Sequence, residues 1–270
     1  MALEKGQVSW ITGASSGIGE AVAQLLAAQE HKLILSARRQ DELERVKTLC
    51  IQAGARDEDV HVLVLDMTDF DAMEQKVQQA REQFGRIDFL FNNAGISQRS
   101  LCVDSELHTY RKLFEVDVFG QIALTKQVLP LMQAQGSGHL SVTASVAGKV
   151  GVPYRTGYCA AKHAMMGFFD ALRAEVARDN IYVSTVTPGF IRTNISNKAL
   201  NGDGSEFGKM DQDIEAGMDV HEAAKKIVKG WKKRKPEIPV GKGMEMHALW
   251  IKRFFPKLLQ KIVARKAAPV

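Results

Sequence analysis

The sequence predicts an α/β protein with a single doubly wound parallel sheet, helices on both faces and a helical extension at the C-terminus. Short β-rich runs alternate with segments of helical period, and glycine-containing or polar turns follow these runs. The expected strands lie at 7–12, 32–37, 60–65, 87–91 and 139–143. We expect the sheet domain to cover residues 1–240 and the extension to cover 241–270.

The composition fits one large folded domain, because 45% of the 270 residues are hydrophobic and 25% are charged. Three widely spaced cysteines without a C-x-x-C pair predict free thiols in a reducing compartment. No apolar run reaches the roughly 18–20 residues of a membrane-spanning helix, and we expect no secretory leader before the first strand. The seven histidines show no metal-ligand spacing. We therefore expect a cytoplasmic protein without a metal.

The net charge of +5 is unevenly distributed. Residues 225–270 hold 14 Lys and Arg against two acids, whereas residues 1–224 carry a net charge of −7. Because the basic character belongs to the tail, it does not indicate a nucleic-acid-binding domain. Apolar residues from Ile251 to Val263 follow helical spacing between basic residues, and Pro256 should divide them into two pieces. We favour packing of this tail on a partner subunit or the pocket over contact with a membrane surface.

The first expected strand ends in the run T-G-A-S-S-G-I-G at residues 12–19, which continues as an apolar-periodic helix. Its glycines allow a tight turn and close approach of a ligand, and the amides of the next helix can face a pyrophosphate. A tight turn without a ligand would use the same residue types. Because this glycine turn lies between an expected strand and an expected helix, we favour dinucleotide binding over a turn without a ligand.

The second strand ends in S-A-R-R at residues 36–39. Enzymes that use NAD usually place an acid at about this position, whereas an arginine accommodates a 2′-phosphate. We therefore expect NADP(H), with Arg38 as the main contact and Ser36 or Arg39 as helpers, although solvated loop arginines would look the same. After the next two strands, Asp66 could meet an adenine amino group, and N-N-A-G at 92–95 would allow close approach of the cofactor.

Tyr158 and Lys162 lie four residues apart in an expected helix from 156 to about 177, and Ser145 follows the strand at 139–143. The helix would place the ammonium near the phenol, and a nearby positive charge favours the phenolate. This pairing suits proton exchange, and the Ser145 hydroxyl could hold a substrate oxygen. Tyr-x-x-x-Lys alone is a weak signal, because a solvated tyrosine and lysine on an amphipathic helix share this spacing.

With these motifs, and with P-G at 188–189 followed by Thr193, the chain resembles the short-chain dehydrogenase/reductase superfamily over roughly residues 6–240. Residues 123–193 are similar to its dehydrogenase/reductase member 7 branch. The resemblance implies a Rossmann-type fold and hydride transfer between nicotinamide C4 and a carbonyl carbon. It makes Tyr158 the general acid or base, lets Lys162 bind the nicotinamide ribose and activate the tyrosine, and lets Ser145 orient the carbonyl.

The resemblance also implies a homodimer or homotetramer and a set of cofactor contacts. Together with their neighbours in the motifs, the expected cofactor-binding residues are Gly13, Ser15, Ser16, Gly17, Ile18, Gly19, Arg38, Arg39, Asp66, Asn93, Ala94, Gly95, Tyr158, Lys162, Pro188 and Thr193.

Asp117 departs from the family pattern, which usually has an asparagine in a run like N-V-x-G where this chain has V-D-V-F-G at 116–120. The family's asparagine helps to anchor a water in a proton relay to the lysine. A backbone carbonyl could still hold the water here, but an ionised carboxylate cannot donate a hydrogen bond. We count Asp117 among the catalytic residues and expect activity with an altered pH profile. The alternative is a nucleotide-binding, catalytically impaired protein with a binding or regulatory role.

Residues 188–216 are rich in Gly, Asn, Asp and Ser, which predicts a mobile substrate loop or lid. Apolar residues near the expected site suggest a hydrophobic ketone, aldehyde or alcohol as substrate. These residues are Val146, Val150, Val152, Phe190, Ile195 and Met210. Peripheral contact with a membrane through the tail stays open.

Overall fold

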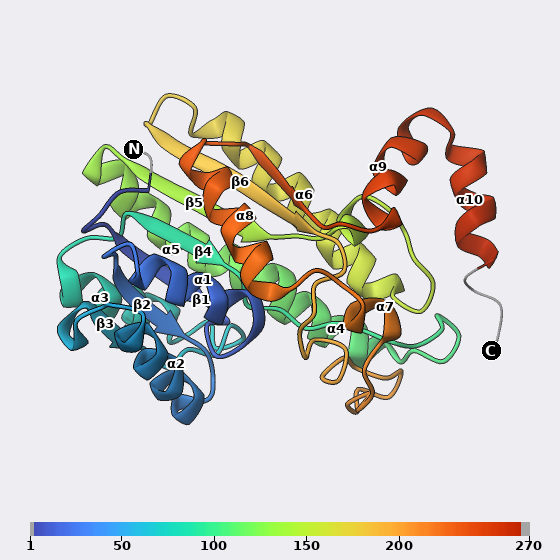
Figure 1. Ribbon diagram of the computed structural model, residues 1–270, viewed down its shortest axis with the longest axis horizontal. Coiled ribbons are helices and arrows are strands. Elements are labelled where there is room, and N and C mark those ends of the chain that lie inside the picture. The colour runs from blue at the N-terminus through green and yellow to red at the C-terminus, as the bar shows by residue number, and fades with distance from the viewer. Residues whose placement is uncertain (1–2, 266–270) are drawn as a thin grey trace.

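Seven parallel strands form one sheet in the order β3-β2-β1-β4-β5-β6-β7 in the computed structural model, which describes residues 3–265 (Figure 1). From β1 the chain moves outward to β2 and β3, returns to place β4 beside β1, and continues through β5 and β6 to β7. This order confirms the predicted doubly wound sheet and puts the switch point between β1 and β4. The strands are β1 Val8–Thr12, β2 Lys32–Ser36, β3 Val60–Val62, β4 Phe89–Asn92, β5 Gly138–Thr143, β6 Ile181–Pro188 and β7 Glu237–Val240.

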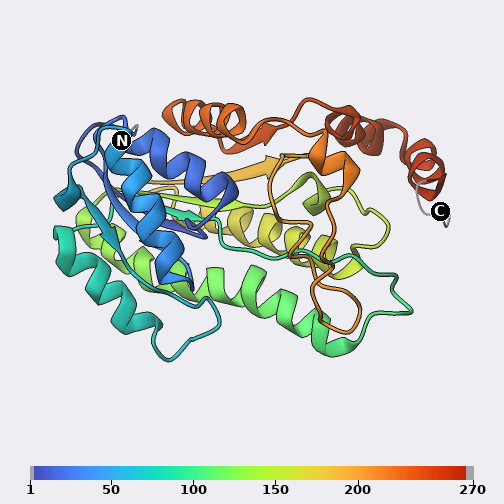
Figure 2. The same ribbon diagram turned by 60° about the horizontal axis from the view of Figure 1, so that its bottom comes forward.

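Helices cover both faces of the sheet, as predicted (Figures 1 and 2). One face packs against α1 Gly17–Ala27, α2 Gln40–Gln52 and α8 Val220–Lys232. The other packs against α3 Met73–Phe84, α5 Gly120–Gln135 and α6 Thr156–Glu175. The remaining helices are α4 Leu107–Phe114, α7 Gln212–Glu215, α9 Met244–Phe254 and α10 Pro256–Arg265.

Alternating side chains of the central strands fill the two layers. In β4, Phe89 and Phe91 point toward the indole of Trp231, with ring centroids 4.7 Å away in each case, while Leu90 joins the opposite layer. The Trp231 indole N–H donates to Ser141 Oγ at 2.8 Å, so the only polar atom of this buried ring is satisfied. Each central strand is therefore held from both faces, as expected of a parallel sheet.

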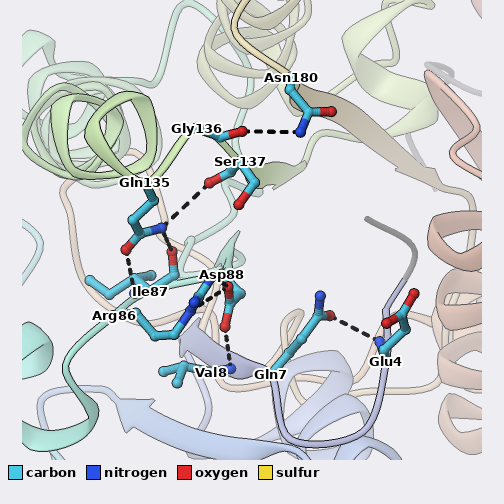
Figure 3. A network of polar contacts seen from close by, with 10 residues as sticks. All are labelled: Glu4, Gln7, Val8, Arg86, Ile87, Asp88, Gln135, Gly136, Ser137 and Asn180. Carbon is cyan, nitrogen blue, oxygen red and sulfur yellow. Dashed lines mark hydrogen bonds and ion pairs between the residues drawn. The ribbon is translucent and has the colours of Figure 1, made fainter.

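Structural hydrogen bonds occupy the edge of the sheet where the strands begin (Figure 3). The buried Asp88 carboxylate accepts from the Val8 N–H at 2.9 Å and from Arg86 Nε at 2.8 Å. The Gln135 side chain, at the end of α5, accepts from the Ile87 N–H and donates to the Ile87 carbonyl, at 3.2 and 2.9 Å. These contacts join β1, β4 and α5 at this edge, while the opposite edge carries the turns predicted to bind a ligand.

The expected bounds are off by one residue for β1, β2 and β5 and by more for β3 and β4, and β6 and β7 were not among the expected strands. The ladder of β3 ends at Val62 rather than at residue 65, although the Leu63 and Leu65 N–H groups still donate to Leu35 and Ala37 carbonyls at 3.0 Å. β4 begins at Phe89 instead of residue 87. At the C-terminus, Pro256 separates α9 from α10 as predicted. The outer ends of the expected domain and extension, residues 1–2 and 266–270, lie outside the described residues.

Two buried histidines make the fold sensitive to acid. Burial, assisted by Lys232, lowers the pKa of His31 from 6.5 to about 4, and burial lowers the pKa of His139 to about 3. The pKa of each histidine is lower in the folded state than in the unfolded state. The contribution of the two histidines to stability is therefore complete above pH 6.5 and declines as the pH falls toward 4. We expect the free energy of unfolding to decline by about 1.4 kcal/mol per pH unit for each histidine in this window.

Urea unfolding between pH 7.5 and 4.5 measures this slope. The His31→Gln variant should show a shallower slope, whereas His247→Gln, which changes an exposed histidine, should match the unsubstituted protein. Equal slopes in all three proteins would contradict this explanation.

Candidate functional site

A cavity of about 470 Å³ opens at the carboxyl edge of the sheet, beside the switch point. Its wall combines the turns after β1, β2 and β4, the segment after β3, the start of α6 and a segment that follows β6. It contains most of the residues predicted to bind a cofactor. These are Gly13, Ser15, Ser16, Gly17, Ile18, Arg38, Arg39, Asp66, Asn93, Ala94, Gly95, Tyr158, Lys162 and Thr193.

The glycine-rich turn needs glycine for two physical reasons. Gly13 and Gly17 have φ angles of +62° and +60°, in the left-handed region that disfavours other residues. A Cβ on Gly13 would also lie 2.8 Å from the Ala94 Cα, and one on Gly19 would lie 2.4 Å from the Gly13 carbonyl oxygen. Gly19 does not line the cavity. It lets the start of α1 pack against the turn, which leaves the α1 N-terminus facing the cavity.

Arg45, which no sequence motif indicated, supports this turn from the side away from the cavity. Its guanidinium donates to the Ser15 carbonyl at 3.3 Å and also binds the carboxylates of Glu20 in α1 and Glu42 in α2, each at 2.8 Å. The two carboxylates raise the pKa of Arg45 above its ordinary value. The glycine turn is thus fixed to both neighbouring helices.

The turn after β2 presents two exposed arginines to the cavity. Arg39 forms a loose ion pair with Glu42 at 3.6 Å, whereas Arg38 forms no ion pair within residues 3–265. The Ser36 hydroxyl, expected as a helper, is buried and accepts the Trp10 indole N–H at 2.9 Å. Asp66 also lines the cavity, and its Oδ1 accepts from the Thr68 N–H and hydroxyl at 2.9 and 2.8 Å.

Asn93 joins the ends of three strands. Its Nδ2 donates to the Thr12 carbonyl in β1 at 3.1 Å, and its Oδ1 accepts from the Thr143 hydroxyl in β5 at 3.0 Å. The Thr12 hydroxyl in turn accepts from the N–H groups of Asn93 and Ala94, at 3.0 and 3.1 Å. The floor of the cavity is therefore a rigid hydrogen-bonded link between β1, β4 and β5.

Tyr158 and Lys162 lie on one face of α6, one turn apart, as the spacing predicted. Lys162 Nζ lies 5.6 Å from the centroid of the Tyr158 ring and donates to the Thr143 carbonyl at 3.0 Å. Both side chains are buried in the protein yet line the cavity. Tyr158 packs with Ala147, Cys159 and Val152, which fixes the ring position.

Ser145 follows β5 and caps a short 3-10 helix, Val146–Gly148. Its Oγ accepts the Ala147 N–H at 3.0 Å and donates to the Pro188 carbonyl at 3.3 Å. Neither Ser145 nor Pro188 lines the cavity wall described above. The Ser145 turn nevertheless packs directly on α6, because a Cβ at Gly148 would lie 2.8 Å from the Lys162 carbonyl oxygen.

Asp117 is completely buried in a π-helical turn, Glu115–Phe119, between α4 and α5. Its Oδ2 forms an ion pair with Lys162 Nζ at 3.0 Å, and its Oδ1 accepts the Ile96 N–H at 2.8 Å. Burial raises the pKa of the Asp117 carboxyl, and the Lys162 ammonium opposes part of this effect. Burial by itself would lower the pKa of Lys162, but Asp117 and Tyr158 together raise it above its ordinary value. The Lys162 side chain is therefore stabilised as an ammonium, with the Asp117 carboxylate as its direct partner.

Residues 194–206, part of the expected substrate loop at 188–216, complete the cavity wall. The lining residues that the motifs missed here are Asn194, Ile195, Lys198, Leu200, Gly204 and Glu206, and only Ile195 had been connected with a substrate. The Leu200 N–H donates to the Ser97 carbonyl at 2.8 Å, and its carbonyl accepts the Arg99 N–H at 2.8 Å. The loop thus crosses the cavity while being hydrogen-bonded to the segment after β4.

The same loop is anchored by Asp211, which is buried at the N-terminus of α7. Its Oδ2 accepts from Arg99 Nη1 at 2.5 Å and from Arg155 Nη2 at 3.0 Å, and Arg155 directly precedes α6. The Arg99 guanidinium also lies over the Tyr154 ring, 5.3 Å from its centroid. One carboxylate thus ties the loop to two segments that flank the cavity.

Neutralising this anchor should loosen the loop. In Asp211→Asn, both arginines lose a charge-assisted partner, so we expect amide hydrogen exchange within residues 196–216 to accelerate by about tenfold or more. Mass spectrometry of peptic fragments measures it. Glu215→Gln, a neighbouring change in α7 at an exposed position, is the matched control. Unchanged protection in Asp211→Asn would contradict the anchoring role.

Within residues 3–265, no helix is both long and apolar enough to span a membrane, and no cluster of three potential metal-ligating His, Cys, Asp or Glu side chains forms.

Comparisons with known proteins agree with this geometry. Residues 7–204 match the family model described as short chain dehydrogenase. A Drosophila melanogaster protein named dehydrogenase/reductase SDR family protein 7-like is 40% identical over 266 residues, covering 97% of this chain and 81% of that protein. The human dehydrogenase/reductase SDR family member 7 is 47% identical over 198 residues, covering 73% of this chain and 58% of the human protein.

Solved structures share the architecture. A short chain dehydrogenase/reductase from Burkholderia phymatum, in complex with NAD, has a TM-score of 0.83 at 24% identity and covers 96% of each chain. An alcohol dehydrogenase from Thermococcus sibiricus, complexed with 5-hydroxy-NADP, has a TM-score of 0.74 at 26% identity and covers 88% of this chain and 97% of that one.

Proposed function

The chain belongs to the short-chain dehydrogenase family, and from this membership we propose that it is an NADP(H)-dependent oxidoreductase that interconverts a hydrophobic ketone or aldehyde and its alcohol. Membership in the oxidoreductase family, and similarity to its member 7 branch, agree with the motifs in the sequence. The single observation that carries the reaction is the pairing of Tyr158 with Lys162 at the wall of a cavity that begins at a glycine-rich turn.

The residues around the cavity fit a nicotinamide dinucleotide. The glycine turn and the N-terminus of α1 would hold the pyrophosphate, and Asp66 would face the adenine. Arg38, exposed and without an acidic partner within the described part of the chain, suits a 2′-phosphate. The related Thermococcus sibiricus enzyme binds 5-hydroxy-NADP, and the Burkholderia phymatum protein binds NAD, so this family fold accepts both cofactor types. The choice of NADP(H) rests on Arg38 and on the missing acid after β2.

When bound, the nicotinamide would supply or accept a hydride at C4. In the reducing direction, the Tyr158 hydroxyl would donate a proton to the substrate oxygen as hydride reaches the carbonyl carbon; in the oxidising direction, the phenolate would take that proton back. The Lys162 ammonium, which lies over the Tyr158 ring, would bind the nicotinamide ribose. Ser145 would exchange its long hydrogen bond to the Pro188 carbonyl for one to the substrate oxygen.

Apolar side chains near this catalytic group support a hydrophobic substrate. Val152 packs beside Tyr158, Ile195 and Leu200 line the cavity, and Val146 and Val150 lie in and next to the Ser145 turn. An apolar wall favours ketones or aldehydes with aliphatic or aromatic bodies. A panel of such compounds, assayed by NADPH absorbance, tests the function and the substrate class together. NADPH binding without turnover of any member would favour the alternative below.

The alternative is a nucleotide-binding protein that is catalytically impaired. The observation that favours it is the direct Asp117–Lys162 ion pair at 3.0 Å, which places a carboxylate against the cation that should activate Tyr158. The remaining catalytic residues favour the enzyme. Tyr158, Lys162 and Ser145 are all present, and Lys162 still faces the tyrosine ring.

Arg38 provides a prediction about the cofactor. Because its positive charge would pair with the 2′-phosphate, Arg38→Gln should raise the KM for NADPH by about tenfold or more and leave the KM for NADH little changed. Steady-state kinetics with both cofactors measures this. Arg39→Gln is the matched control, and we expect a smaller effect because Arg39 already pairs with Glu42. An equal change in the KM for NADPH and the KM for NADH would argue against recognition of the 2′-phosphate by Arg38.

Oligomeric state and location complete the proposal. The exposed stripe of α6 carries the small residues Ala160, Ala164, Gly167 and Ala171, which would allow close packing with a second α6 in a homodimer or homotetramer. We propose a cytoplasmic location.

A further inference from the structure

The C-terminal helices α9 and α10 have an inner face that packs on the catalytic domain. Leu259 is buried against Val146 and Val150, which lie close to Ser145 in the chain, and Met246 and Val263 pack against the same cluster. Glu245 also points toward the domain, because its Oε1 accepts the Phe190 N–H at 3.4 Å. This packing leaves the opposite face of both helices directed away from the domain.

That outward face carries much of the exposed apolar surface. Six of the twelve exposed large hydrophobic residues within residues 3–265 lie in α9, in α10 or at the junction between them, with 41 to 76% of their surface accessible. They are Met244, Trp250, Phe254, Phe255, Leu258 and Ile262. The rings of Trp250 and Phe254 stack with centroids 6.0 Å apart and planes 8° apart. Apolar clusters of this kind on a soluble protein mark a surface that binds a partner.

The charges around this apolar surface are all positive. Arg253, Lys257, Lys261 and Arg265 are exposed, and none of them forms an ion pair with any residue in the described range. Lys252 is instead directed toward the domain, where its Nζ donates to the Lys149 carbonyl. Glu245, the single acid in α9 and α10, faces the domain. A partner of this surface should therefore be apolar in its interior and negatively charged where it first meets the helices.

We propose that the outward face of α9 and α10 docks on the surface of an anionic lipid bilayer. Basic helices with Trp, Phe and Leu on one side bind in the headgroup region, where cations meet anionic lipids and the apolar side chains enter the acyl boundary. A second copy of the chain is a poorer partner, since a twofold contact through the same face would set four cations against four. The complementarity of charge therefore favours lipid.

The position of these helices agrees with such docking. Figures 1 and 2 show α9 and α10 at one end of the molecule, beyond the carboxyl edge of the sheet, and the loop between β4 and α4 extends to the same end. This loop carries the exposed apolar residues Leu101 and Val103. If the proposed function holds, an apolar carbonyl compound would reach the site from the lipid side. The docking itself does not depend on that function.

Co-sedimentation of the full chain with vesicles tests the proposal. We expect binding to vesicles of phosphatidylcholine mixed with phosphatidylserine, much weaker binding to phosphatidylcholine alone, and release by high salt. Lys257→Glu with Lys261→Glu should weaken binding to the anionic vesicles by at least about tenfold, since each cation near the surface contributes substantially. Lys225→Glu with Lys229→Glu, the same charge change on the exposed side of α8, is the control.

A second pair of variants tests the apolar component. Trp250→Ser with Phe254→Ser should also reduce binding at least tenfold, whereas Phe70→Ser, an exposed phenylalanine outside the tail, should not. Circular dichroism and NADPH binding check that each variant is folded. Three outcomes would overturn the proposal: no pelleting of the unsubstituted chain with anionic vesicles, equal pelleting of all variants, or a dimer in light scattering that the Trp250 and Phe254 changes convert to a monomer.

Discussion

Replacing Tyr158 with phenylalanine is expected to reduce turnover by roughly a hundred- to ten-thousandfold, the usual contribution of a positioned general acid or base. The substitution removes one oxygen and keeps the ring that packs against Ala147, Cys159 and Val152. The hydroxyl forms no hydrogen bond with residues 3–265. We therefore expect the fold and the affinity for NADPH to survive while proton transfer is lost.

Steady-state kinetics and NADPH titration by fluorescence separate these effects. Tyr182→Phe is the matched control, because Tyr182 is remote from the cavity and interacts with Arg234. Turnover of Tyr158→Phe within a few-fold of the unsubstituted protein would remove Tyr158 from the reaction. Loss of NADPH binding together with turnover would instead assign it a role in the cofactor site.

The second large effect concerns Asp117. In Asp117→Asn the buried Lys162 loses its counter-charge, so burial lowers the pKa of Lys162 without the opposing carboxylate. The high-pH limb of the pH profile for alcohol oxidation, which requires the protonated Lys162, should therefore move to lower pH by about one unit or more.

The amide cannot reproduce both contacts of the carboxylate. If Oδ1 keeps accepting the Ile96 N–H, then the Nδ2 donor faces the Lys162 ammonium; the opposite orientation sets two N–H donors against each other. Rates measured from pH 5 to 10 report the shift, with Asp71→Asn as an exposed control. Profiles of Asp117→Asn and the unsubstituted protein that superimpose would show that the ion pair does not tune the reaction.

The first five strands of the sheet could be predicted from the sequence because the pattern that specifies them is local. Each buried parallel strand is a short run of apolar residues. A segment with helical periodicity separates it from the next strand. Pro256 likewise divides the tail through its own covalent geometry. The shorter ladder of β3 depends on pairing with β2 alone at the edge of the sheet, which no local pattern records.

In the candidate site too, some contacts follow from local spacing in the sequence and others depend on the folded chain. Tyr158 and Lys162 meet because four residues make about one helical turn, so their contact follows from spacing. The contacts of Arg45 with Ser15, of Asn93 with Thr143 and of Asp211 with its two arginines join segments between 30 and 112 residues apart in the chain. Only the folded chain brings these partners together. The composition of residues 188–216 predicted a mobile loop, but it did not indicate that Asp211 anchors this loop.

The Asp117–Lys162 contact is an intermediate case. The sequence identified Asp117 as a carboxylate at an unusual position and predicted an altered pH profile from it. The π-helical turn Glu115–Phe119 decides the direction of this side chain, and no feature of V-D-V-F-G predicts that turn.

The most direct test of the central claim is a label-transfer experiment. NADPH carrying deuterium at C4 is incubated with the protein and a hydrophobic ketone, with each C4 diastereomer supplied separately, and the alcohol is examined by mass spectrometry and NMR. We expect one diastereomer to place deuterium on the carbinol carbon, and Tyr158→Phe almost to abolish this product. An alcohol that carries no label with either diastereomer, or no alcohol from any ketone or aldehyde while NADPH is bound, would contradict this mechanism.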